Sequence, residues 1–208
     1  MADKFPIQVY DGADRYCEAY RDSILRAWTS IEVSAVARAA TLVRECMLRD
    51  GIVYACGNGG SAAIANHLLC DFQKGVQTGT GRQPRVVSLS APLELITAIA
   101  NDISYDEVFV YQLRTMARPG DLLIVISASG NSENIVRAVM WAKSNAVPTI
   151  AMTGFSGGRS ASVADVVLHV DSQNYGITED VFQSMMHVIA QYLRQSWMAA
   201  ADVSGAKF

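Results

Sequence analysis

Apolar residues recur at helical spacing over residues 13–49, the first patterned stretch along the sequence. They fall on positions one helical turn apart, namely Ile24, Leu25, Trp28, Val33, Val36, Ala40, Val43 and Met47. This spacing predicts one long helix, or two helices joined near residues 29–30. Gly51 follows as a stop signal.

Short apolar runs alternate with helical stretches over the rest of the chain. The runs predict strands at 52–56, 85–89, 122–126, 148–152 and 166–170. The stretches between and after them predict helices at 61–74, 92–100, 107–117, about 133–145 and 178–198. The alternation predicts an α/β fold: a doubly wound, five-stranded parallel sheet with an added N-terminal helical element. Five strands are too few for an eight-stranded barrel.

The chain has 208 residues, and no Pro/Ser-rich linker divides it. We therefore expect a single domain over residues 1–208. The N-terminal stretch, residues 13–50, carries more apolar residues than one face of a small sheet needs. We interpret it as an oligomerisation element, with ordinary helix packing as the alternative.

Composition excludes several classes of protein. Half of the residues are hydrophobic and 18 % are charged, which excludes a disordered chain. The net charge is −3 and no basic block occurs, so neither a nucleic acid nor a membrane surface is expected as a partner. There is no secretory signal pattern, and the four cysteines are scattered without a CxxC pair. We expect a cytoplasmic protein with reduced thiols.

Two glycine- and serine-containing turns follow predicted strands and open predicted helices. The first is GNGGS, residues 57–61, and the second is SASGNS, residues 127–132. Open α/β sheets bind ligands at this edge, and a helix start accepts anions. Neither turn has a nucleotide-hydrolysing P-loop or a dinucleotide fingerprint. The pair predicts a small phosphorylated ligand bound by neutral donors; the alternative is two ordinary turns with N-caps.

Two histidines are accompanied by carboxylates at helical spacing. His67 and Asp71 are four residues apart, and Glu179 and His187 are eight apart with Gln183 between them. Such groups can hold a divalent ion such as zinc, or act as general acid and base, and the residues alone leave both open. The alternative is that each histidine is a core residue. His169 lies in a predicted strand and is expected to be structural or solvent-facing.

Four segments, in this order and spacing, resemble the sugar-isomerase (SIS) domain, and within it the phosphoheptose isomerases. They are GNGGSAAIANHLLCDF, ITAIANDISYDEVF, ISASGNS and GITEDVFQSMMHVIAQYL. The similarity runs from about residue 24 to residue 194. It implies a flavodoxin-like sheet and a homotetramer with sites between subunits. It also implies an enzyme that interconverts a ketose 7-phosphate and an aldose 7-phosphate through a cis-enediol.

The resemblance also implies roles for individual residues. Asp71 and His187 correspond to the proposed base and acid. The zinc ligands of some members correspond to His67, Asp71, Glu179 and His187. The substrate-binding residues that it implies are Asn58, Gly59, Gly60, Ser61, Asp102, Ser127, Ser129, Gly130, Asn131, Ser132 and Glu179.

The chain departs from the family pattern at three positions. Asp71 stands where the family usually has Glu, Glu179 where it has Gln, and Ile64 where it has Asp. These changes suggest a related phosphosugar isomerase that acts on sedoheptulose 7-phosphate or on a close analogue of it. A non-enzymatic branch of the family binds the bacterial replication initiator but lacks the acid and the C-terminal histidine. Asp71 and His187 therefore favour the enzyme over a regulator or scaffold.

Overall fold

The computed structural model describes residues 4–208. Its centre is a five-stranded sheet in which every neighbouring pair is parallel, in the order β2-β1-β3-β4-β5. The strands are β1 (Ile52–Gly57), β2 (Arg85–Ser88), β3 (Leu122–Ser127), β4 (Thr149–Thr153) and β5 (Val166–His169). The predicted doubly wound, five-stranded parallel sheet is confirmed, and each strand lies within one or two residues of its predicted bounds.

Helices precede the sheet and connect its strands. Before β1 lie α1 (Ala13–Thr29) and α2 (Val33–Leu48), so the N-terminal helical stretch is two helices. The connections contain α3 (Gly60–Cys70), η1 (Asp71–Val76), α4 (Leu93–Asp102), η2 (Tyr105–Glu107), α5 (Val110–Met116), α6 (Glu133–Ser144) and α7 (Gly158–Val163). The chain closes with α8 (Tyr175–Trp197) and α9 (Ala200–Val203).

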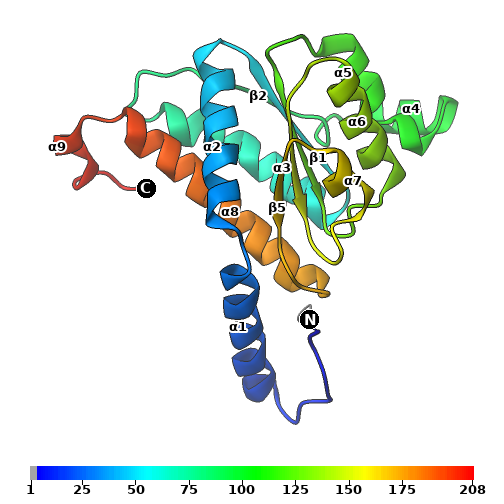
Figure 1. Ribbon diagram of the computed structural model, residues 1–208, viewed down its shortest axis with the longest axis vertical. Coiled ribbons are helices and arrows are strands. Elements are labelled where there is room, and N and C mark those ends of the chain that lie inside the picture. Colours follow the sequence, from blue (N-terminus) through cyan, green and yellow to red (C-terminus); the bar gives the residue numbers. More distant parts are fainter. Residues whose placement is uncertain (1–3) are drawn as a thin grey trace.

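Alternate residues of the central strands face two separate cores. On β3, Ile124 and Ile126 pack with apolar residues of α2, α3 and α8. Leu123 and Val125 pack with those of α4, α5 and α6. All four side chains are at most 3 % exposed, which explains why the strand reads as a continuous apolar run. Figure 1 shows the two helical layers on either side of the sheet, with α1 reaching beyond it.

Two predicted helices differ from the structure. The helix predicted over 61–74 is α-helical only to Cys70 and continues as the π-helical turn η1. The helix predicted over 107–117 is divided, because the Ser104 hydroxyl accepts a hydrogen bond from the Asp106 amide and so begins η2 separately. Helix α7 was not predicted, since six residues carry little periodicity.

The strand order places both glycine- and serine-containing turns at one point of the fold. The chain reverses its direction of winding between β1 and β3, and ligands of such sheets bind at this switch point. Strand β1 ends at Gly57 and β3 ends at Ser127, so the two turns are neighbours. Within residues 4–208, no helix combines the length and apolar character that a bilayer span requires.

Candidate active site

A pocket of about 150 Å³ lies between the two turns. Its lining is rich in hydroxyl and amide groups and contains no lysine or arginine: Asn58, Ser61, Ile126, Ser127, Ala128, Ser129, Ser132, Tyr175 and Glu179. The serines of both turns thus share one cavity, as their positions after neighbouring strands require.

Two serine hydroxyls of the second turn accept hydrogen bonds from backbone amides of the same turn. Ser127 Oγ accepts a hydrogen bond from the Gly130 amide, and Ser129 Oγ accepts one from the Asn131 amide, both at 3.2 Å. Each hydroxyl therefore keeps its own proton for a ligand. Ser132 is the N-cap residue of α6, but its side chain makes no capping hydrogen bond. Three hydroxyls at the start of a helix form a cradle suited to an oxyanion.

Asn58 connects the first turn to the helix that follows the second. It donates to Asn134 Oδ1 at 2.9 Å and accepts from Asn134 Nδ2 at 3.0 Å. The hydroxyl of Tyr105, in η2, also donates to Asn58 Oδ1, at 2.9 Å. Asn134 is 2 % exposed, so this amide pair fixes the spacing between the two turns.

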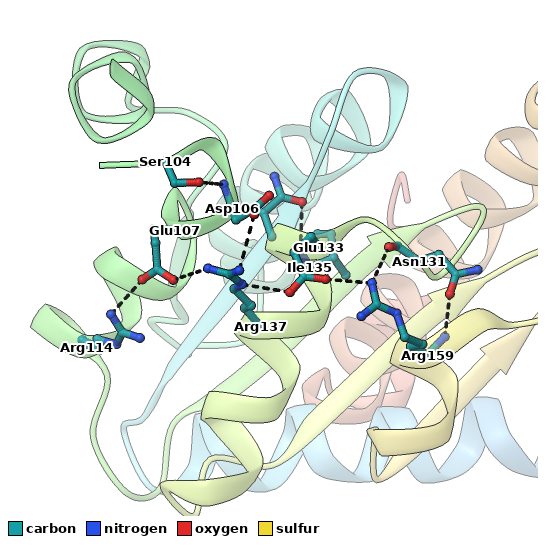
Figure 2. A network of polar contacts seen from close by, with 10 residues as sticks. Ser104, Asp106, Glu107, Arg114, Asn131, Glu133, Ile135, Arg137 and Arg159 are labelled. Carbon is teal, nitrogen blue, oxygen red and sulfur yellow. Dashed lines mark hydrogen bonds and ion pairs between the residues drawn. The ribbon is translucent and has the colours of Figure 1, made fainter. Parts of the chain in front are cut away.

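Behind the pocket, charged residues connect η2 to the start of α6. Arg137 donates to Glu107 Oε1 at 2.8 Å and to Glu133 Oε1 at 2.9 Å, and its guanidinium lies 3.4 Å from Asp106. Figure 2 shows Arg137 between the carboxylates of Glu107 and Glu133. The hydrogen bond from Arg137 holds the pKa of Glu107 below its usual range, with a further contribution from Arg114. This ion-pair network keeps η2 against α6.

The second cluster of polar side chains lies further along α3 and α8. Asp71 Oδ1 is 3.3 Å from His67 Nε2, and Asp71 Oδ2 is 3.3 Å from His187 Nε2. The two Nε2 atoms are 3.4 Å apart, and Gln183 Nε2 lies 3.1 Å from that of His187. One carboxylate thus bridges two imidazoles. Of the four residues expected to hold one ion, His67, Asp71 and His187 come together here.

This cluster has the donor types that zinc takes. Single ligand atoms of His67, Asp71 and His187 all lie within 4.8 Å of one another. Imidazole nitrogen and carboxylate oxygen are ordinary zinc ligands, and three protein ligands with a free position are typical of catalytic sites. The side chains are 27–47 % exposed, so a ligand can reach them.

Glu179 lies at the pocket rather than in the histidine cluster. A Cβ atom added to Gly60 would meet Glu179 Oε2 at 2.4 Å, so the carboxylate lies against the Gly60 backbone. Burial raises the pKa of Glu179 above its usual value, and the adjacent Asp180 carboxylate adds to this. Asp180 itself accepts a hydrogen bond from Tyr20 of α1, at 2.8 Å.

Helices α3 and α8 run side by side in the same direction past both clusters. Gly60 lies beside Glu179 near their starts, and the rings of His67 and His187 have centroids 5.1 Å apart further along. At 1.5 Å rise per residue, the six residues from Ser61 to His67 span about 9 Å. The pocket and the histidine cluster therefore lie along the same pair of helices.

Comparison with known proteins identifies the family of this chain. The SIS domain family model matches residues 15–154. A phosphoheptose isomerase from Colwellia psychrerythraea is 35% identical over 171 residues, which is 81% of this chain and 87% of that protein. The chain belongs to the SIS domain family.

Solved structures support the same assignment. The phosphoheptose isomerase from Neisseria gonorrhoeae superposes with a TM-score of 0.81 at 33% identity, covering 88% of this chain and all of that one. The Francisella tularensis phosphoheptose isomerase gives 0.83 at 28% identity, over 89% of this chain and all of that one. These comparisons confirm the expectation that the chain is an isomerase of the SIS family.

Not every SIS residue implied by the resemblance lines the pocket. Asp102, the last residue of α4, is exposed and accepts from Asn101 Nδ2 at 2.8 Å. Asn131 is exposed and turns toward α7. Gly59 and Gly130 have positive φ, 54° and 64°, and shape the two turns. The substrate-binding roles that the resemblance implies for these residues remain predictions. The catalytic roles of Asp71 and His187 and the role of Glu179 as a fourth zinc ligand also remain predictions.

Three further residues of the site were missed from the sequence. Asn134 holds Asn58, Tyr175 lines the pocket, and Arg159 contacts the second turn. Asn134 stands two residues after Ser132, so its closeness to the SASGNS turn could have indicated it. Tyr175 precedes the predicted start of the last helix, and Arg159 is distant in sequence, so no local signal marked either of them.

Proposed function

We propose that this SIS-family enzyme interconverts a ketose 7-phosphate and an aldose 7-phosphate. The pair that fits its relatives' name is sedoheptulose 7-phosphate and D-glycero-D-manno-heptose 7-phosphate, or a close analogue. The observation that carries this proposal is the placement of two groups of side chains along α3 and α8. One is a cradle suited to an oxyanion, and the other is a carboxylate between two imidazoles.

The chemistry of each end follows from its groups. The serine turns hold the phosphate, so that binding energy away from the reaction positions the reacting carbons. Asp71 accepts the proton from one of C1 and C2 and returns it to the other through a cis-enediol. His187 exchanges the proton of the adjacent oxygen. Because Asp71 lies 3.3 Å from both Nε2 atoms, it orients the two rings as well.

We also propose that His67, Asp71 and His187 bind zinc, since single ligand atoms of all three lie within 4.8 Å of one another. Bound zinc would polarise the sugar carbonyl as a Lewis acid. Metal analysis after zinc loading should give about one ion per chain. His67→Asn should lose it and His169→Asn, the matched control, should keep it. Zinc retained by His67→Asn would remove this assignment.

The test of the reaction is turnover in D₂O. Incubation with sedoheptulose 7-phosphate should give an aldose phosphate that carries solvent deuterium, and NMR measures its formation. Zinc is supplied, and other ketose phosphates are run in parallel. If folded protein neither converts nor exchanges any of them, the proposed reaction is wrong.

The alternative is a regulator or scaffold that binds a sugar phosphate, or a partner of the replication-initiator type, without reaction. The Asp71 carboxylate lies 3.3 Å from both His67 and His187. This arrangement favours the enzyme, since binding a sugar phosphate without reaction does not require it. His187→Ala separates the two: a regulator would bind phosphate before and after the change and would have no turnover to lose.

We propose further that copies of this chain assemble, as a homotetramer with sites between subunits. An apolar groove lies between α2 and α8, and Val33, Val188 and Tyr192 on its lining are 79 %, 41 % and 52 % exposed. Exposed apolar surface of this kind is typical of an interface. Val188 follows His187 directly, so an interface on this face of α8 would adjoin the active site.

A further inference from the structure

The second serine turn is supported from behind by the loop before α7. The Gly154 amide donates to Ala128 O and the Ser160 amide donates to Gly130 O, both at 2.9 Å. The backbones touch closely, because a Cβ on Gly130 would lie 1.9 Å from Gly157 O. The shape of the turn is therefore determined by a loop about 30 residues further along the chain.

Arg159, at the start of α7, makes the side-chain contacts between this loop and the turn. Its backbone amide donates to Asn131 Oδ1 at 3.0 Å, and its Nη2 donates to Asn131 O at 3.0 Å. The same Nη2 donates to Glu133 Oε2 at 2.8 Å. Figure 2 shows Arg159 reaching Asn131 and Glu133 together. Arg159 does not line the pocket, so it acts through these two residues.

The contact with Glu133 matters because of charge. Glu133 is the first residue of α6 and directly follows Ser132, the last serine of the anion cradle. An unpaired carboxylate there would repel a phosphate group. Arg137 takes Oε1 and Arg159 takes Oε2, so both oxygens are engaged by guanidinium groups. The pocket lining itself has no cation to offset the charge.

We infer that Arg159 is a positioning residue for the phosphate end of the site. It holds Asn131, and with it the Ser129–Ser132 turn, and it neutralises Glu133 beside the cradle. This inference rests on the proposed function, because it presumes that the cradle binds a phosphate group.

The probe is inorganic phosphate, titrated into the purified full-length protein by calorimetry. Arg159→Met should weaken phosphate binding by at least about tenfold, as expected for lost hydrogen bonds to a charged group. The matched control is Arg114→Met, which removes a guanidinium from the far end of the same network, where Arg114 contacts Glu107. The control should bind within about twofold of the wild type. Equal binding by Arg159→Met and wild type, or an equal loss in the control, would overturn the inference.

Steady-state kinetics with the sugar phosphate give a second readout. Arg159→Met should raise KM while kcat stays within about threefold, because the groups around Asp71 are untouched. Arg159→Lys should be intermediate, since lysine keeps the positive charge near Glu133 but not the fork of donors that arginine has. A fall in kcat with unchanged KM would contradict a role at the phosphate end.

A double-mutant cycle with Glu133→Gln separates the two effects of Arg159. Removing the carboxylate should recover part of the affinity that Arg159→Met loses, and the remaining deficit is the positioning of the turn. Complete recovery would show that Arg159 only neutralises Glu133, and would overturn the positioning role. If the wild type itself binds no phosphate, the anion site and the proposed function fail, and not this inference alone.

Discussion

Asp71 is one methylene shorter than the glutamate of the family pattern, but each of its oxygens lies 3.3 Å from a histidine Nε2. Its place in the helix explains this reach. Asp71 begins the π-helical turn η1, where α3 ends. Such turns change the direction of side chains and occur often at functional sites. At the residue scale, the substitution keeps the contact with both histidines.

Asp71→Asn tests this residue directly. The amide keeps the shape but cannot accept the carbon-bound proton, so isomerase turnover should fall by about 10²–10⁴-fold. Inorganic phosphate should still bind with the wild-type affinity, because the cradle is at the other end of α3. Both are measured on the same preparation. Turnover within about tenfold of the wild type would exclude Asp71 as the base.

At the element scale, the two serine turns depend on backbone contacts that no single side chain provides. Gly130 has φ of 64° and lies against Gly157, whereas Gly81 has φ of 66° with no atom within 4 Å of an added Cβ. The two glycines therefore share a conformation but differ in their surroundings.

This pair separates strain from close packing. Gly81→Ala should cost about 1–2 kcal/mol of unfolding free energy, the cost of a left-handed L-residue. Gly130→Ala should cost about 1–3 kcal/mol more, because its methyl group meets Gly157 O, and it should also weaken phosphate binding. Urea unfolding measures the first effect and calorimetry the second. Equal losses in both variants would show that the turn tolerates displacement.

The ion pair between Glu107 and Arg137 joins η2 to α6, and its contribution to stability should depend on pH. The folded pKa of Glu107 lies below its usual 4.5 because of the hydrogen bond from Arg137. Its stabilisation is therefore present above the unfolded pKa and is lost as pH falls through the folded value. Glu107→Gln should be less stable than the wild type at pH 7, and the difference should shrink as the pH falls below 4.5. A constant difference in urea midpoint across this range would contradict the assignment.

At the scale of the whole molecule, the chain leaves apolar surface that its own fold does not cover. Helix α1 extends beyond the sheet in Figure 1, and the groove between α2 and α8 remains open. The N-terminal helices thus pack one face onto the sheet core while residues such as Val33 remain exposed.

Val188→Glu tests self-association. Val188 is 41 % exposed in the single chain, so the fold should tolerate glutamate, while a charge buried between copies should dissociate them. Light scattering after gel filtration should show a tetramer for the wild type and smaller species for the variant. Met140→Glu, on α6 and 54 % exposed, is the control and should keep the wild-type mass. A monomeric wild type would refute the proposed assembly.

Much of the fold was predictable, because its signals are local. The LLIVI run of β3 and the helical spacing of α8 depend only on neighbours along the chain, so the residue pattern determined them. The spacing of His67 and Asp71 likewise fixed them on one helix face. The sequence by itself thus determined the order of elements, the two serine turns and the residue types of the histidine cluster.

The tertiary structure alone decided which of these groups meet. Only packing brings α3 beside α8, places Glu179 against Gly60, and sets Arg159 behind a turn nearly 30 residues away. Contacts between elements depend on strand order, helix rotation and the space that glycines leave, and none of these has a short-range signature in the chain. This is why the residue pattern could indicate which side chains gather in the pocket and in the histidine cluster, but not the residues that support them.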